Sequence, residues 1–341
     1  MAETWFELSA DVKSEALEYA ATKTGRPAHL LEKDIWVVWI ISVIYESELA
    51  QKLTFKGGTS LSKAYGIIDR FSEDVDLTYD IRELLGNFLT NGNPIPKNTS
   101  QQQKISKLVR DNLPIWIETK VKPIIEKALQ REGIEAEITQ TGNESEKLVL
   151  GYQAVKSGNG YSAPTIQLEF GGRATGEPHH VRSVICDISQ TIENVIFPKA
   201  KPLVMTAERT FWEKATAAHV YCLQGRLRGE RYSRHWYDLT ALAKSAYFFT
   251  ACNDAELANM VAEHKTMFFV EKDKHGSKID YYAATRGQLL LIPQGESLTA
   301  LERDYENMLK DGLLSINQPS FAEVIDKCQD IQDQVNKHRI S

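Results

Sequence analysis

The sequence predicts a mixed α/β core followed by a helical C-terminal half. Strand-like runs alternate with helical patterns over the first 200 residues, whereas helical periodicity alone continues from Thr206 onward. With 341 residues, the chain is long enough for two domains. We therefore expect a core domain at 1–200 and a helical domain at 201–341.

Two helical patterns open the chain, at about 8–22 and 29–45. Gly25 ends the first pattern and Pro27 begins the second, which is apolar on most sides. A helix without a polar face is expected to be buried. A further short helix is expected at 59–65.

Short runs rich in apolar and β-branched residues predict strands that join one sheet. These runs lie at 53–56, 75–79, 135–140, 147–153 and 165–170. A long helix is expected at 101–132, with a kink near Pro114 because proline removes a backbone donor. Residues 83–100 are expected to form an exposed loop, and 192–202 to connect the domains. The later helices are expected at 207–223, 234–246, 255–268, 297–313 and 321–337.

Composition indicates a globular protein without a membrane segment. The longest apolar run, 35–45, is too short to span a bilayer, and the N-terminus lacks the features of a signal peptide, so we expect a cytoplasmic protein. The four cysteines form no zinc-binding or disulfide pattern. The net charge of −6 argues against a broadly basic protein, but residues 201–250 carry eight Lys/Arg against four Asp/Glu. We therefore expect any polyanion to bind at residues 201–250.

The most informative stretch joins a glycine turn to a strand with two carboxylates. Gly57 and Gly58 stand where a strand should lead into a helix, and such a turn leaves backbone N–H groups for phosphate. Asp74 and Asp76 lie two apart on the next strand, so their side chains share one face and can hold one divalent cation. This is the plan of a nucleotidyl-transfer site.

The glycine turn alone also fits an ordinary tight connection, and its lysines also fit an ordinary surface. The neighbouring hydroxyl and basic residues favour nucleotide binding. The residues expected to contact the nucleotide are Lys56, Gly57, Gly58, Thr59, Ser60, Lys63, Arg70 and Ser72.

Nucleotidyl transfer normally uses three carboxylates, and a third is expected on a neighbouring strand. Glu169, between Leu168 and Phe170, meets this condition and is our candidate for the third metal ligand. An isolated glutamate at this position would otherwise be a solvent-facing strand residue.

A second group of candidate residues lies in the helical half. Lys214 is embedded among Phe211, Trp212 and Ala215, and a cation near the β- and γ-phosphates is what the chemistry still requires. Asp238 either pairs structurally with Lys214 or Arg234, or orients Lys214 within the site. Both remain open from the sequence.

A basic, glycine-punctuated segment at 224–234 lies between the two helices that carry these residues. Beside a nucleotide site it is the best candidate for gripping an RNA backbone, although a charge run is more often a solvated loop.

These residues resemble the AbiEii/AbiGii toxin family of nucleotidyltransferases, relatives of the MenT toxins within the DNA polymerase β-like superfamily. The resemblance covers nearly the whole chain, in several separate blocks that occur in the right order. The blocks are 31–34, 56–77, 211–214, 234–239 and 301–308.

The resemblance implies a polymerase β-like transferase core with a mixed sheet, use of an NTP with Mg²⁺ or Mn²⁺, and a cognate antitoxin. It also implies roles by position: Asp74 and Asp76 match the metal-binding acids, Lys214 the catalytic lysine, and Asp238 the later catalytic acid. Gly58, Thr59 and Ser60 match the nucleotide-binding turn, and Ser72 the serine two residues before the first acid. Some members transfer nucleotides to the 3′ end of tRNA.

The leading hypothesis is therefore a toxin-type nucleotidyltransferase that transfers NMP from an NTP to an acceptor hydroxyl, with tRNA as the expected acceptor. In this hypothesis the helical domain contributes Lys214 and Asp238 to the site. Two alternatives stay open. The same site could modify a protein hydroxyl, or the fold could act without turnover by binding an antitoxin or nucleic acid.

Overall fold

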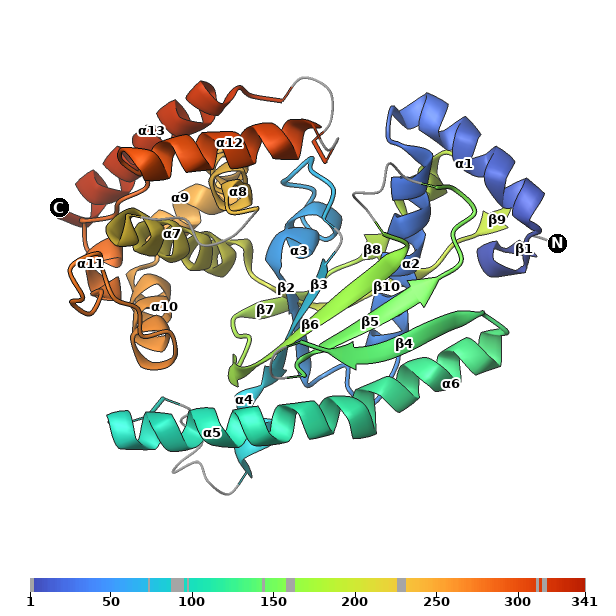
Figure 1. Ribbon diagram of the computed structural model, residues 1–341, viewed down its shortest axis with the longest axis horizontal. Helices are drawn as coiled ribbons and strands as arrows, with labels where there is room; N and C mark the ends of the chain where they lie inside the picture. The colour runs from blue at the N-terminus through green and yellow to red at the C-terminus, as the bar shows by residue number, and fades with distance from the viewer. Residues whose placement is uncertain are drawn as a thin grey trace. The chain divides into compact units, whose positions relative to one another are not determined.

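Figure 1 shows the computed structural model, in which the chain forms two compact units. The structure describes residues 3–72, 74–86, 95–96, 98–142, 145–157, 163–225, 231–310, 313–314 and 318–340. The first unit, called the core unit here, comprises Met1–Ala64, Phe71–Pro94 and Lys104–Met205. The second, called the helical unit, comprises Tyr65–Arg70, Ile95–Gln103 and Thr206–Ser341.

The two segments 65–70 and 95–103 differ from the sequence prediction, which placed them in the first domain. Contacts between residues far apart in the sequence explain why 65–70 belongs to the helical unit. Arg70 pairs with Asp238, and the ring of Tyr65 packs edge-on against that of Tyr247. Such contacts leave no local pattern in the sequence.

A seven-stranded mixed sheet forms the centre of the core unit, with the strand order β4-β5-β6-β3-β2-β11-β7 (Figure 1). The β3–β6 and β2–β11 pairs are parallel, and the other pairs are antiparallel. The predicted mixed sheet is therefore confirmed. The strands are β2 (Leu53–Lys56), β3 (Asp74–Asp80), β4 (Ala136–Thr141), β5 (Lys147–Tyr152), β6 (Thr165–Ala174), β7 (His179–Val181) and β11 (Leu203–Met205).

Two smaller strand pairs complete the described β-structure of the core unit. β1 (Glu3–Thr4) pairs in parallel with β9 (Val195–Ile196), and β8 (Val184–Ile185) pairs with β10 (Lys199–Ala200). The sequence predicted only a connection at 192–202, because strands of two residues show no periodicity.

The helices of the core unit support the sheet. They are α1 (Ala10–Thr24), α2 (Ala28–Tyr45), α3 (Gly57–Lys63), α4 (Ile81–Leu85), α5 (Thr99–Trp116) and α6 (Lys122–Glu132), of which α5 begins in the helical unit. α2 is buried from Leu30 to Ile44, as predicted, and packs against β6 and β10. The long helix continues through Pro114 and widens into a π turn at Ile117–Val121 before α6.

The helical unit is built around α7 and α8. Its helices are α7 (Ala207–Gln224), α8 (Ser233–Ala243), α9 (Ala246–Asn253), α10 (Ala255–Phe268), α11 (Tyr281–Thr285), α12 (Glu296–Lys310) and α13 (Phe321–Ile340). The predicted helix at 234–246 is wrong at its end, because α8 stops at Ala243 and α9 begins at Ala246. Buried Trp212 and Trp236 each donate their indole N–H to a backbone carbonyl of the same unit.

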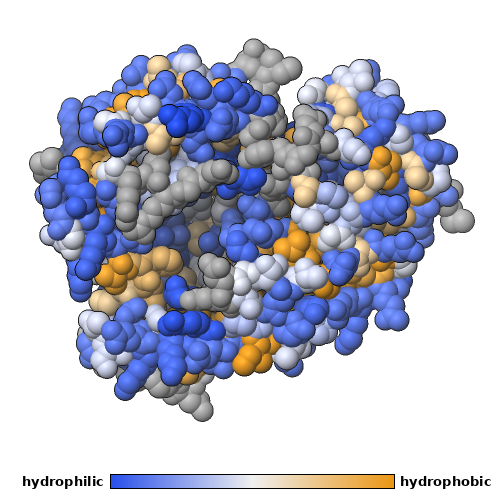
Figure 2. All heavy atoms as spheres, viewed as in Figure 1, coloured by the Kyte–Doolittle hydropathy of each residue, from blue (hydrophilic) through white to orange (hydrophobic). Residues whose placement is uncertain are grey.

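Hydrophilic residues dominate the face of the molecule shown in Figure 2, with smaller hydrophobic areas between them. Among the described residues, no helix is both long enough and apolar enough to cross a membrane.

Candidate functional site

The glycine turn and the carboxylate strand meet at Gly57 and Asp76. β2 ends at Lys56, and Gly57 begins α3 with φ +79°, in the region that favours glycine. A Cβ on Gly57 would lie only 2.0 Å from Oδ2 of Asp76. The Asp76 carboxylate therefore lies against the turn, and it does so only because residue 57 has no side chain.

Asp74 and Asp76 project from the half-exposed face of β3. Val75 and Leu77, which alternate with them, are completely buried on the other face. Asp76 is the register partner of Lys56 on β2 and of Glu169 on β6. The structure thus brings the three predicted metal ligands and Lys56 to one face of the sheet.

Glu169 is held by two further side chains of this face. Lys147 on β5 is its register partner, and Lys147 Nζ lies 2.5 Å from Glu169 Oε1. The side-chain amide of Gln167 donates to the same oxygen at 2.6 Å. Four strands therefore carry a row of charged residues, Lys56–Asp76–Glu169–Lys147, which we call the charged row.

The ammonium group of Lys147 is stabilised by its neighbours. Partial burial would lower the pKa of Lys147, but hydrogen bonding to Glu169 and the charges of Glu169, Asp74 and Glu146 outweigh it, so the pKa is raised. Lys147 is therefore a fixed positive charge beside the carboxylates. The sequence prediction missed this residue, because the register between β5 and β6 cannot be seen in the sequence.

The donor set suits a hard divalent cation, since Asp74 and Asp76 offer carboxylate oxygens from one face, two residues apart. In the part of the chain that the structure describes, no three acidic, histidine or cysteine side chains gather closely enough to hold a metal ion. Glu169 shares the face with the two aspartates, but its carboxylate is hydrogen-bonded to Lys147 and Gln167.

The hydroxyl residues of the turn hold the turn itself together. Thr59 donates to Ser72 Oγ at 2.9 Å and also contacts the carbonyl of Asp74. Ser60 donates to the carbonyl of Gly57 at 2.9 Å, and both Thr59 and Ser60 are fully buried. Their side chains thus fix α3 to the start of β3.

Lys63, at the end of α3, pairs with carboxylates of the scaffold. Its ammonium lies 2.6 Å from Asp34 on α2 and 2.5 Å from Asp187. Burial would lower the pKa of Lys63, but the two carboxylates raise it, so the lysine stays charged. Lys63 therefore anchors α3 to α2, and no local pattern in the sequence indicates this role of Asp34 and Asp187.

In the helical unit the structure brings together Arg70, Lys214 and Asp238. Arg70 donates from Nε and Nη2 to the two oxygens of Asp238, at 2.7 and 2.8 Å. Lys214 Nζ lies 2.8 Å from Asp238 Oδ2, and Asp238 is completely buried. Burial would raise the pKa of Asp238, but Arg70 and Lys214 outweigh it and hold the pKa well below its ordinary value. Asp238 is thus a permanent anion that orients both cations.

Asp304 orders the start of α8, the helix that carries Asp238. Its carboxylate accepts hydrogen bonds from the backbone N–H groups of Arg231 and Ser233 and from the Ser233 hydroxyl, at 2.6 to 2.8 Å.

The sequence predicts that the basic segment 224–234 binds an RNA backbone. The structure describes residues 224–225 and 231–234 of this segment, whereas residues 226–230 lie outside the described residues.

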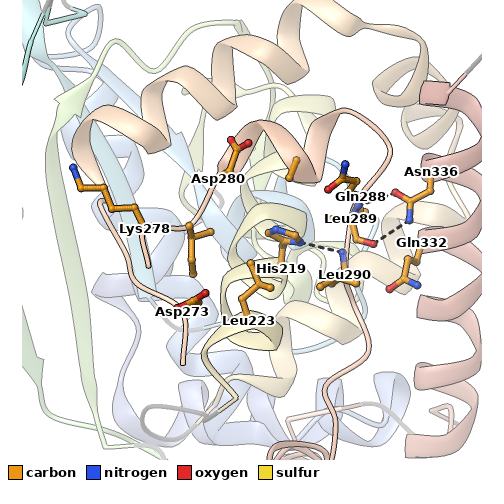
Figure 3. Close-up of a pocket in the computed structure, with 12 residues that line it drawn as sticks. His219, Leu223, Asp273, Lys278, Asp280, Gln288, Leu289, Leu290, Gln332 and Asn336 are labelled. Atoms are coloured by element: carbon orange, nitrogen blue, oxygen red, sulfur yellow. Dashed lines mark hydrogen bonds between the residues drawn. The ribbon is translucent and has the colours of Figure 1, made fainter. Parts of the chain in front are cut away.

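The helical unit also contains a cavity of about 400 Å³, lined by α7, α11, α13 and the segments before and after α11 (Figure 3). His219 on α7 accepts a hydrogen bond from the backbone N–H of Leu290 through Nδ1, and its buried Nε2 has no partner among the described residues. Burial lowers the pKa of His219 to about 4, so the imidazole is neutral. The predicted site residues do not line this cavity.

A mixed sheet with a carboxylate face and an adjoining glycine turn defines an α/β protein suited to chemistry on nucleotides. The family model described as "Nucleotidyl transferase AbiEii toxin, Type IV TA system" matches residues 39–327. The chain therefore belongs to this family of toxin-type nucleotidyltransferases, as the sequence resemblance predicts.

Among solved structures, the chain is similar to the nucleotidyltransferase toxin MenT4 from Mycobacterium tuberculosis H37Rv and to JHP933 from Helicobacter pylori. MenT4 shares 14% identity over 97% of this chain and 99% of its own, with a TM-score of 0.41. JHP933 shares 15% identity over 91% of this chain and 93% of its own, with a TM-score of 0.39. No curated protein matches the chain.

Replacing Gly57 with alanine tests the contact with Asp76. We expect G57A to lower the free energy of unfolding by about 2–3 kcal/mol, because the new methyl group collides with the carboxylate and the positive φ is strained. Urea unfolding measures the change. Gly133 is the matched control, since it has φ +64° with nothing near its Cβ position, so G133A should cost only about 1 kcal/mol. Equal losses in both variants would contradict the proposed contact.

Replacing Asp238 with asparagine tests the buried ion pairs. We expect D238N to lower the free energy of unfolding by about 3–5 kcal/mol at neutral pH, because Arg70 and Lys214 would face each other without a shared anion. E118Q, which breaks an exposed pair with Lys122, should change it by less than about 1 kcal/mol.

The same variant carries a pH prediction. The folded-state pKa of Asp238 is depressed, so its contribution to stability is complete above the unfolded pKa of about 4 and is lost as the pH falls through the folded value. Unfolding curves of wild type and D238N should therefore differ by a constant amount from about pH 5 to 8 and converge in stronger acid. A difference that vanished already near pH 6 would show that Asp238 titrates in the neutral range.

Proposed function

We propose that this protein transfers a nucleoside monophosphate from an NTP to an acceptor hydroxyl, at the 3′ end of tRNA, with release of pyrophosphate. The observation that carries the proposal is the close approach of the Asp76 carboxylate to the Gly57 turn, with Asp74 and Glu169 on the same face. The proposal is supported because backbone N–H groups and carboxylates, which suit a phosphate and a divalent cation, lie close together.

In this proposal Asp74 and Asp76 hold Mg²⁺ or Mn²⁺, and Glu169 is the candidate third ligand. Bound there, the ion supplies Lewis-acid stabilisation of charge on the phosphate oxygens. The backbone N–H groups of the Gly57–Gly58 turn bind phosphate, and Lys56, beside Asp76 in the sheet, contributes positive charge. The acceptor oxygen bonds to the α-phosphorus, the bond to pyrophosphate breaks, and the hydroxyl proton is released.

Lys214 retains, as a proposal, the role of a cation for the triphosphate, and its contact with Asp238 supports a fixed orientation. Asp238 and Arg70 then act through Lys214 as positioning residues. Because Asp238 is fully buried and stays ionised, it suits the positioning of a cation better than the exchange of a proton.

The choice of a nucleic-acid acceptor is supported by charge. Residues 201–250 carry eight Lys/Arg against four Asp/Glu in a chain whose net charge is −6. Membership of a type IV toxin–antitoxin family supports a cognate antitoxin as the further partner.

Incubation of the protein with total tRNA and each of the four α-³²P-labelled NTPs tests the proposal. We expect label in tRNA with at least one NTP, and a loss of about 100-fold for D76N, which removes a carboxylate charge from the face. E137Q is the charge-matched control and should keep wild-type transfer. Glu137 is exposed on the edge strand β4, which β5 and β6 separate from β3.

The identity of the labelled product separates the alternatives. Label in a protein band and none in RNA would replace tRNA by a protein acceptor on the same site. Absence of label with all four NTPs, for protein that is folded and toxic to cells, would rule out nucleotidyl transfer as the source of toxicity.

A further inference from the structure

Lys147 and Gln167 hold the Glu169 carboxylate within the sheet. Both donate to the same oxygen, Oε1, at 2.5 and 2.6 Å. Lys147 reaches Glu169 from the neighbouring strand β5, whereas Gln167 lies two residues before it on β6. An ammonium ion on Oε1 repels a divalent cation that approaches the same carboxylate, because both are positively charged.

The positive charge of Lys147 also acts on the two aspartates of the face. Its side chain is 29% exposed, and its register partner Glu169 is in turn the register partner of Asp76, two residues after Asp74. Three carboxylates on one face repel one another when no cation is present. A lysine in register with one of them relieves this repulsion without any bound ion.

We infer that Lys147 is a built-in counter-ion that occupies Glu169 until a divalent cation bound at Asp74 and Asp76 displaces it. The inference rests on the proposed function, because it assigns a role toward the same cation. Glu169 then becomes a metal ligand only when Lys147 releases it. Lys147 is thus a positioning residue that weakens metal binding in the nucleotide-free protein.

The hydrogen bonds of Glu169 support this state of the face. The backbone register brings Glu169 beside Asp76, yet its carboxylate is hydrogen-bonded to Lys147 and Gln167. A purely structural cross-strand ion pair would hold β5 to β6 equally well but would leave the affinity for metal unchanged.

Titration with Mn²⁺ alone, followed by electron paramagnetic resonance of the free ion, tests the inference without nucleotide. K147M removes the charge and keeps an unbranched side chain, and we expect it to bind Mn²⁺ about tenfold more tightly than wild type. K147R keeps the charge and should stay within about threefold of wild type.

A double-mutant cycle tests whether Lys147 changes the affinity for Mn²⁺ through the Glu169 carboxylate. E169Q should change Mn²⁺ affinity little when Lys147 is present, because the cation gains the carboxylate as a ligand only by breaking its ion pair with Lys147. In the K147M background the same change should abolish the tenfold gain. Thermal unfolding verifies that each variant is folded, and K147Q carries the same expectation as K147M if the methionine variant does not fold.

The outcomes separate the inference from the proposed function. Equal Mn²⁺ affinity in wild type and K147M, or a gain that persists in K147M/E169Q, overturns the role of Lys147 and leaves the metal site standing. Absence of Mn²⁺ binding in both wild type and K147M overturns the metal site and the inference together.

Discussion

The contact between the Asp76 carboxylate and the Gly57 backbone fixes the arrangement of the candidate site. β2 and β3 are antiparallel neighbours, so the turn that leaves β2 lies over residues at the start of β3. Asp76 can face this turn only because residue 57 lacks a Cβ. The position of the glycine turn and that of the carboxylate face are therefore linked, and Lys56 lies beside them as the register partner of Asp76.

Two buried charge clusters hold the elements that carry this chemistry. Lys63 links α3 to α2 through Asp34, and Asp238 links α8 to α7 through Lys214. A buried charge without its partner is costly, so each cluster disfavours other packings of its helices. This explains why several charged residues in the sequence blocks that resemble the family are almost completely buried. Their charges orient neighbouring side chains and backbone, and Arg70, which binds both oxygens of Asp238, is the clearest case.

Local signals in the sequence predict much of the fold and part of the candidate site. The glycine turn and the spacing of Asp74 and Asp76 are local, and the strand predicted at 53–56 coincides with β2. The partners of these residues are not local. Glu169 and Lys147 are 22 residues apart, and Arg70 and Asp238 are 168 apart, so their pairing depends on register and packing that no periodicity reports. Short strands such as β8 and β10 were missed because two residues show no alternation.

In the proposed function, the charged row and Asp74 connect metal binding to nucleotide binding. Of these side chains, Asp74, Asp76 and Glu169 are acidic and Lys56 and Lys147 are basic, so the lysines balance part of the negative charge that a free divalent cation meets. A nucleoside triphosphate adds negative charge beside the turn, which favours the cation and gives the ammonium groups another partner. By linkage, the cation then favours the nucleotide to the same degree. A face whose negative charge is partly balanced by its own lysines would thus assemble its full set of ligands only when the substrate is present.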